Sequence, residues 1–406
     1  MDARGRQRWL ILALGLCAQA ATSSFLYGLP MLVPELRAEQ GLSLVQSGAV
    51  VAAPALGLLL TLIAWGALAD RYGERWVIVA GLGGATAFLV VAARLHGVAP
   101  LCTALAVAGA FAASVNAASG RLVMGWFAPH ERGLAMGIRQ TGQPLGVAYA
   151  ALVLPPAAQR WGFGTTLLIP ALTCLALAGL VALLAADPPR RPAGRSLPAR
   201  SPYRVPTLWR LHAASTLLVV PQFAVSGFSM IYLVAVRHWE VTDAGRLLFV
   251  AQLLGAIGRI GSGVWSDRVG NRLGPMRQLA IASALVMIAA AVCDRLSSPV
   301  VIAVLVVGAV VTVADNGLAF TATAEIAGSS WAGRALGAQN TAQNVASTLT
   351  PPLLGALITA HGYAVGFAAV ALCPIVAIGL TPVADEHRGA RLDAAPSSEI
   401  GVDTRS

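Results

Sequence analysis

Twelve long apolar runs limit what this chain can fold into. A helix needs about 20 mostly apolar residues to cross the hydrocarbon core of a bilayer. The runs lie at 9–34, 44–69, 76–95, 98–124, 133–156, 164–186, 211–236, 245–266, 277–293, 299–323, 335–358 and 365–384. The strands of an outer-membrane barrel would give much shorter and weaker runs. The sequence therefore predicts an all-α membrane protein with twelve transmembrane helices.

The composition agrees with this fold class. Hydrophobic residues make up 57% of the chain and charged residues 11%, whereas a soluble domain carries about 25% charge. The five cysteines form no CxxC pair, and none has a histidine at ligand spacing, so we expect no disulfide framework, metal site or cofactor. The first run could also be a signal peptide because three arginines precede it; its removal would break the twelve-span count.

The basic residues are unevenly distributed along the chain. All 28 are arginine, and the net charge is +10. With a cytoplasmic amino terminus, 19 lie in the termini and in the loops after even-numbered spans, against six in the opposite loops. This bias follows the positive-inside rule. It predicts a bacterial inner-membrane protein with both termini in the cytoplasm, and the charge needs no nucleic-acid partner.

The chain also repeats itself. "GALADRYGER" at residues 66–75 returns as "GVWSDRVGNR" at residues 263–272, and "RGLAMGIRQTGQ" at 132–143 is echoed by "RALGAQNTAQ" at 334–343. We predict two six-helix bundles, 1–186 and 211–384, joined by a Pro- and Arg-rich cytoplasmic linker at 187–210 and followed by a disordered tail at 385–406. Parallel six-helix repeats are a known transporter plan, with the substrate site between the halves.

The charged turn G-x-L-x-D-R-x-G-x-R resembles the signature of the major facilitator superfamily. The resemblance covers essentially the whole chain and implies two bundles that rock around a central site. It also implies that the turns latch the bundles on the cytoplasmic side. The residues of the two latches would be Gly66, Asp70, Arg71, Gly73 and Arg75, and Gly263, Asp267, Arg268, Gly270 and Arg272. The alternative is that these charges only set the topology.

Three charged residues lie well inside the spans and are functional candidates because charge in the hydrocarbon is costly. Arg259 lies about 12 Å along its helix from Asp267, and its surroundings resemble span eight of monocarboxylate and oxalate porters, where this arginine meets the substrate carboxylate. Its alternative partner is Asp315, which is also the candidate for proton coupling, with Asn316 beside it. Arg139 either lines the cavity or snorkels to the cytoplasm.

Polar residues at equivalent places in both halves predict a wet central cavity. We expect substrate contacts from a set of side chains in spans one, five, seven and eleven: Tyr27, Gln140, Gln143, Tyr232, Asn340, Gln343 and Asn344. The same stripes could instead bond neighbouring helices. Arg121, near the end of span four, is expected at the membrane interface.

These features together predict a monomeric secondary transporter, not an enzyme, since no P-loop, HExxH or GxSxG motif occurs. The expected substrate is a small organic anion such as a monocarboxylate, moved with protons or a counter-solute, with membrane lipid as the surrounding partner. The alternatives are efflux of a lipophilic drug and a non-transporting membrane sensor, which would be expected to carry a signalling domain.

Overall fold

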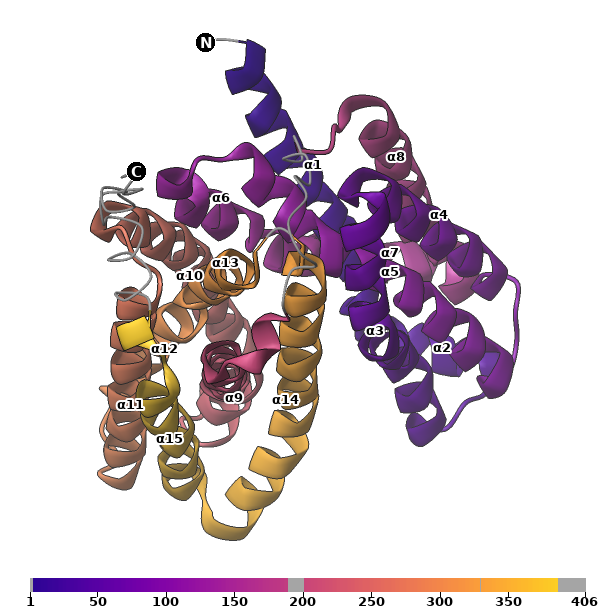
Figure 1. The fold of residues 1–406 in the computed structure, drawn as a ribbon. Helices are drawn as coiled ribbons and strands as arrows, with labels where there is room; N and C mark the ends of the chain where they lie inside the picture. Colours follow the sequence, from indigo (N-terminus) through magenta and orange to yellow (C-terminus); the bar gives the residue numbers. More distant parts are fainter. Residues whose placement is uncertain (1–2, 189–200, 329, 386–406) are drawn as a thin grey trace, which may run out of the picture.

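The computed structural model describes residues 3–188, 201–328 and 330–385, and within these ranges it contains helices and no strand (Figure 1). The first half comprises α1 (Ala3–Leu26), η1 (Leu29–Leu32), α2 (Val33–Gln40), α3 (Leu44–Tyr72), α4 (Glu74–Ala92), α5 (Val98–Trp126), η2 (Pro129–Glu131), α6 (Arg132–Arg139), α7 (Gly142–Thr166) and α8 (Leu168–Leu184). The second half comprises η3 (Pro202–Arg204), α9 (Pro206–Ala235), α10 (Val241–Val269), α11 (Leu273–Arg295), α12 (Val301–Ala314), α13 (Asn316–Ala327), α14 (Ala332–His361) and α15 (Tyr363–Leu380).

The predicted runs coincide with these helices, and the expected all-α fold is confirmed. Nine helical segments of the described chain are long and apolar enough to cross a membrane. A tenth candidate is the helical stretch Pro129–Thr166 together with α8, two segments that meet at a bend of 71°. Two predicted spans are broken in the middle, as α6 with α7 and as α12 with α13. The span formed by α14 is 30 residues long but less apolar, because it carries the polar stripe expected for span eleven.

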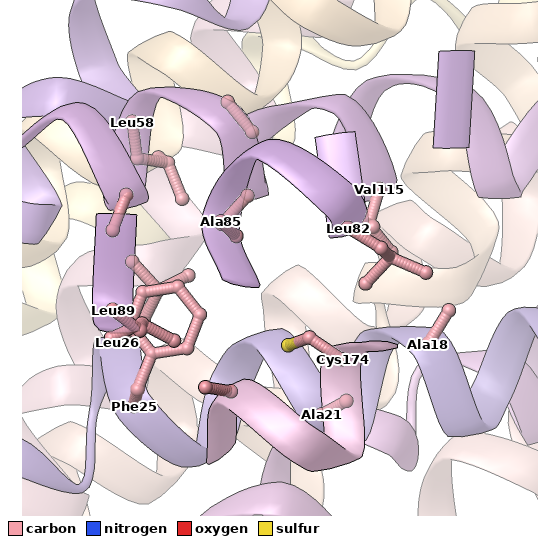
Figure 2. Close-up of a cluster of buried hydrophobic side chains, with 14 of the residues drawn as sticks. Ala18, Ala21, Phe25, Leu26, Leu58, Leu82, Ala85, Leu89, Val115 and Cys174 are labelled. Atoms are coloured by element: carbon pink, nitrogen blue, oxygen red, sulfur yellow. The ribbon is translucent and has the colours of Figure 1, made fainter. Parts of the chain in front are cut away.

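Each half has its own hydrophobic core. The largest buried cluster draws only on residues 11–185, and Figure 2 shows part of it, with Phe25 and Leu26 of α1 facing Leu58 and Leu89. The other half has separate clusters between residues 208 and 377. Alanine and glycine are frequent at these contacts, and small residues let membrane helices approach closely.

The two halves meet along a few reciprocal helix contacts. In Figure 1, α6 of the first half lies beside α10 and α13 of the second, while α14 of the second half borders α3 of the first. One small cluster contains residues of both halves: Met124 and Met136 pack with Phe320, Ala324, Ala332 and Leu336. The interface is therefore formed by the four helices that carry the repeated motifs, together with α5 and α13.

One end of the bundle carries both charged turns, and we call it the charged end, defined by Asp70 and Asp267. The start of α1 lies there, because Arg8 pairs with Glu131 of η2. The stretch after α15 lies near the start of α9, where Thr207 donates a hydrogen bond to Asp385. Helix α9 begins at residue 206, five residues before the predicted start of the second bundle at 211. Residues 189–200 of that linker and 386–406 of the predicted tail are outside the described ranges.

Candidate functional site

A polar cavity lies between the two halves. The space that no atom fills in and around it, open solvent included, is about 560 Å³. Eight of the expected site residues line it or lie at its edge: Tyr27, Arg139, Gln140, Gln143, Asn316, Asn340, Gln343 and Asn344. Sequence reasoning missed Gln19, Asn116, Val219, Gln222, Phe223 and Phe320, while Ser347 belongs to the polar stripe of α14. Gln19, Asn116 and Gln222 carried a usable signal, since each is an isolated amide inside an apolar run.

Arg139 brings a positive charge to this cavity. Its side chain is 4% exposed, and its guanidinium is held by neutral partners. Nε and Nη2 donate to Ser119 Oγ at 3.0 and 2.9 Å, Nη2 also donates to Gln19 Oε1 at 3.4 Å, and Nη1 donates to Gln140 Oε1 at 2.7 Å. Within the described residues no carboxylate pairs with Arg139, and the cavity lining contains no Asp or Glu. The cavity therefore holds a cation without a protein counter-ion.

The backbone carbonyl of Gln140 lies at the break between α6 and α7 and lacks its usual helical partner. Pro144 has no backbone N–H, so it cannot donate to the carbonyl of Gln140 four residues earlier. The guanidinium of Arg259 takes that place, with Nη1 3.4 Å from the Gln140 carbonyl oxygen. A broken helix in a membrane is tolerated where the freed backbone groups find other partners. Arg259 thus holds the backbone of Gln140 while Arg139 holds its side chain.

Arg259 itself does not line the cavity, which differs from its expected contact with substrate. It is buried, and Asp315 is its electrostatic neighbour. The two form no ion pair within 4.0 Å in the described chain, and Arg259 Nε and Asp315 Oδ2 have no hydrogen-bond partner there. Asp315 lies at the break between α12 and α13. Its neighbour Asn316 does face the cavity, and Asn316 Nδ2 donates to Gln222 Oε1 at 3.0 Å.

On the opposite wall, α14 supplies three amides in successive turns. Asn340 Nδ2 donates to the carbonyl of Leu336 at 3.0 Å, and Gln343 Nε2 donates to Ser215 Oγ at 2.6 Å. Asn344 Nδ2 donates to the Asn340 carbonyl at 2.8 Å. Each side chain is thereby fixed through its nitrogen. The repeat brings Gln140 and Gln143 of one half to the same cavity as their equivalents Asn340 and Gln343.

The two tyrosines differ in location. Tyr27 lines the cavity and lies 3.4 Å from Asn344 Oδ1, across the interface between the halves. Tyr232 does not line the cavity, contrary to expectation. It is fully buried among Tyr363 and Phe367 of its own half and donates to Asp294 Oδ1 at 2.8 Å. Its position along span seven resembled that of Tyr27 along span one, but its side chain points into the local core.

At the charged end, Asp70 binds the start of a helix from the other half. Its carboxylate, 4% exposed, accepts hydrogen bonds from the backbone N–H groups of Gly333 and Arg334 at 2.9 and 3.1 Å. These groups belong to the first turn of α14, whose positive dipole end attracts an anion. A Cβ at Gly333 would overlap the Gly66 carbonyl oxygen. The absence of side chains at these glycines is therefore required for the contact.

Asp267 makes the reciprocal contact in the other direction. It accepts from the backbone N–H groups of Gly133 and Leu134, in the first turn of α6, at 2.9 and 2.7 Å. Its Oδ1 also accepts from Arg272 Nη1 at 2.6 Å. A Cβ at Gly263 would overlap the Gly133 carbonyl oxygen. The sequence repeat is thus a structural repeat, in which each half binds a helix of the other.

Within its own half, Asp70 pairs with an arginine from another helix. Arg121 forms ion pairs with Asp70 and, through Nε at 2.7 Å, with the fully buried Glu74. Arg75 instead donates to the Ala182 carbonyl, and its backbone N–H donates to Asp187 Oδ1 at 2.8 Å. Arg121 was expected only to lie at the membrane interface, but it also pairs with two buried carboxylates. It was the one arginine near the charged end of span four.

The remaining turn residues have other roles. Arg71 and Arg268 are exposed, and Arg71 stacks over Tyr72. Gly73 and Gly270 have φ of 100° and 73°, values that glycine adopts easily and that end α3 and α10. The carboxylates and close glycines thus contact the other half, while Arg71 and Arg268 face away.

Taken together, a twelve-helix bundle with an internal repeat and a polar cavity between its halves is the architecture of a membrane transporter. The sequence profile of the Major Facilitator Superfamily matches residues 11–351. The chain belongs to this superfamily, and its members are transporters and not enzymes.

Three comparisons support this assignment. An uncharacterized MFS-type transporter of Mycobacterium tuberculosis, Rv2994, is 41% identical over 379 residues, covering 93% of this chain and 85% of the relative. A probable nitrate/nitrite transporter of the same species, NarK2, is 26% identical over 262 residues, 62% of this chain and 65% of the relative. The crystal structure of the E. coli fucose:proton symporter FucP superposes with a TM-score of 0.72 at 17% identity, covering 92% and 98% of the two chains.

Proposed function

We propose that this transporter moves a small organic anion, such as a monocarboxylate, through the cavity between its two halves. The observation that carries the proposal is Arg139, a buried guanidinium in a polar cavity whose lining has no acid. An ionised side chain inside a membrane needs a counter-charge. Among the described residues its partners are all neutral, so an anionic substrate supplies that charge.

The sequence favoured Arg259 as the residue that contacts the substrate carboxylate, and we now propose Arg139 for that contact. Arg259 supports the site from behind, because it holds the Gln140 carbonyl that Pro144 leaves without a partner. NarK2, whose name refers to nitrate and nitrite, provides a further argument for an anion. Efflux of a lipophilic drug fits less well, because twelve of the fifteen lining residues are polar or charged.

The two reciprocal carboxylate contacts support alternating access. Asp70 and Asp267 each bind the first turn of a helix from the opposite half, and both contacts lie at the same end. Rocking the halves apart at the charged end would break both contacts together. We therefore assign them the role of a latch for the state that is closed there. The arginine bias of the loops places this end in the cytoplasm of a bacterial inner membrane.

Asp315 is the proposed site of coupling to protons or to a counter-solute. It is buried beside Arg259, and its Oδ2 has no hydrogen-bond partner in the described chain. Asn316 connects it to the cavity, one residue along the chain. A change in the charge of Asp315 would act on Arg259 and, through Gln140, on the residues around Arg139. Coupling through this route is part of the proposal.

The test is a thermal-shift screen of the purified full-length protein against carboxylates, amino acids, sugars and cationic drugs. We expect carboxylates to raise the melting temperature of the parent. Arg139→Gln should abolish that shift, and Arg139→Lys should restore little of it, because a lysine cannot reproduce the arginine hydrogen bonds to Ser119, Gln19 and Gln140. Arg246→Gln is the matched control, since Arg246 is exposed and far from the cavity. An Arg139→Gln protein that binds carboxylates with parental affinity would overturn the anion assignment.

A further inference from the structure

Three amide oxygens that lack a donor, those of Asn316, Asn340 and Gln343, face the central cavity from the wall formed by the second half, opposite the guanidinium of Arg139. We infer that the preferred substrate is a carboxylate that carries hydroxyl groups at its other end, a polyhydroxylated carboxylate. This inference rests on the proposed function, and it names the class of anion. It depends on which amide atoms are already bonded within the protein and which remain for a ligand.

The wall formed by the first half presents donors from Arg139, Gln140 and Asn116, beside Gln143, whose amide forms no hydrogen bond within the described chain and offers both an oxygen and a nitrogen. Arg139 uses four N–H groups on Ser119, Gln19 and Gln140, which leaves one N–H on Nη1. Gln140 Oε1 accepts from Arg139, so its Nε2 remains for a ligand. In the same way Asn116 Oδ1 accepts from Gln19 Nε2 at 2.7 Å, which leaves Asn116 Nδ2. Neither amide nitrogen has a partner among the described residues, and both side chains line the cavity.

The wall formed by the second half presents acceptors. Asn340, Gln343 and Asn316 each use the amide nitrogen within the protein, toward Leu336, Ser215 and Gln222. The amide oxygens of these three residues accept no hydrogen bond within the described chain, and all three side chains line the cavity. Donors remain on this wall as well: Gln222 Nε2 is free because Gln222 accepts from Asn316 through its oxygen, and Gln343 Nε2 and Asn316 Nδ2 each keep a second N–H. The three unpaired oxygens are therefore what only a donor on the ligand can satisfy.

This arrangement selects for a ligand with two unlike ends. A carboxylate has only acceptors at neutral pH, so it suits the guanidinium and the amide nitrogens of the first wall. It cannot bond to the amide oxygens of the second wall, which need donors. An ammonium would supply donors, but it would add a positive charge to a cavity that already holds one and has no acid in its lining. Neutral hydroxyl groups supply donors without that charge.

The cost of a mismatch sets the expected selectivity. A site that hydrogen-bonds a substrate hydroxyl rejects an analogue that lacks it, because the buried polar groups of the site are left unpaired. A simple alkanoate would leave three amide oxygens facing methylene groups. A polyol would leave the guanidinium without an anion. Either analogue should bind more weakly than the hydroxylated acid by about tenfold or more.

The experiment compares carbon-matched ligands by thermal shift and calorimetry with the full-length protein. Glycerate, threonate and gluconate carry both groups; propionate, butyrate and hexanoate carry only the carboxylate; glycerol, erythritol and sorbitol carry only hydroxyls. We expect at least one hydroxylated acid to bind at least tenfold more tightly than both of its matched partners. Alkanoates that bind as tightly as their hydroxylated partners would overturn the inference and leave the proposed function intact. Polyols that bind as tightly would overturn both, and so would the absence of binding by all carboxylates.

A variant tests the second wall directly. Gln343→Met keeps the volume but removes Oε1, together with the Nε2 bond to Ser215. We expect it to weaken binding of the preferred hydroxylated acid about tenfold, and any effect of the lost Ser215 bond should be the same for the acid and the matched alkanoate. Thr359→Ala on the same helix is the control, because Thr359 is exposed, does not line the cavity and donates to the Gly355 carbonyl at 2.8 Å. Equal losses for the acid and the alkanoate, or no loss for either, would contradict the assignment. If Gln343→Met does not fold, the ligand comparison on the parent decides alone.

Discussion

Replacing Asp70 by asparagine should shift the protein away from the state closed at the charged end. The carboxylate accepts two backbone hydrogen bonds from the first turn of α14 and pairs with Arg121. An asparagine keeps one acceptor oxygen and has no net charge. At least one charge-assisted hydrogen bond, worth about 1.5–3 kcal/mol, and the attraction to the helix dipole, worth up to about 2 kcal/mol, are therefore weakened.

We take about 2 kcal/mol as the net loss, which changes the ratio of closed to open states about 30-fold, since 1.4 kcal/mol is a factor of ten. Because Asp267 makes the reciprocal contact, Asp267→Asn should act in the same direction. The double variant should lose about twice the free energy. The central cavity is untouched in each case, so transport rate should fall far more than substrate affinity.

Double electron–electron resonance can measure this shift. Spin labels at Arg71→Cys and Arg268→Cys, both exposed and on opposite halves, report the separation at the charged end after the native cysteines are removed. We expect a longer-distance population to grow in Asp70→Asn. Asp243→Asn is the control, because Asp243 makes only an exposed pair with Arg246. Unchanged distances together with parental turnover at matched expression would refute the latch.

Three further predictions follow from the same contacts. Gly263→Ala should open the charged end and slow transport, since its methyl group would overlap the Gly133 carbonyl at a cost of about 1–3 kcal/mol. Gly261→Ala on the same helix is the control: its methyl group would meet nothing within 4 Å, so transport should be unchanged. Arg259→Gln should lower the melting temperature by leaving Asp315 without its cationic neighbour, and the added change Asp315→Asn should recover part of the loss. If the stability changes of the two single variants simply add in the double variant, the two residues are not coupled. A single cysteine at position 198 should react with an impermeant reagent only in opened cells, and labelling in intact cells would reverse the predicted orientation.

Local sequence patterns determined most of the fold. Hydropathy located the twelve spans, because the bilayer demands runs of a certain length whatever their neighbours are. The repeated turn located the two carboxylates that join the halves, because equivalent positions in a structural repeat occupy equivalent surroundings. Polar residues at equivalent places in the two halves located eight of the fifteen lining residues, since a polar group in a membrane requires a partner or water. The isolated amides Gln19, Asn116 and Gln222 were missed because they lack an equivalent in the repeat.

Only the tertiary structure decided which side chains meet. Arg139 and Arg259 are both lone guanidinium groups in apolar helices, and the sequence alone favoured Arg259 as the substrate ligand. In the folded chain Arg259 bonds to the Gln140 carbonyl that Pro144 leaves without a helical partner, whereas Arg139 lines the cavity, and our proposal for the substrate contact rests on this difference. The partners of Asp70 were equally hidden, since they are backbone groups of a helix more than 260 residues away. Hydropathy and periodicity describe one segment at a time, whereas these contacts depend on how the ends of distant helices are brought together.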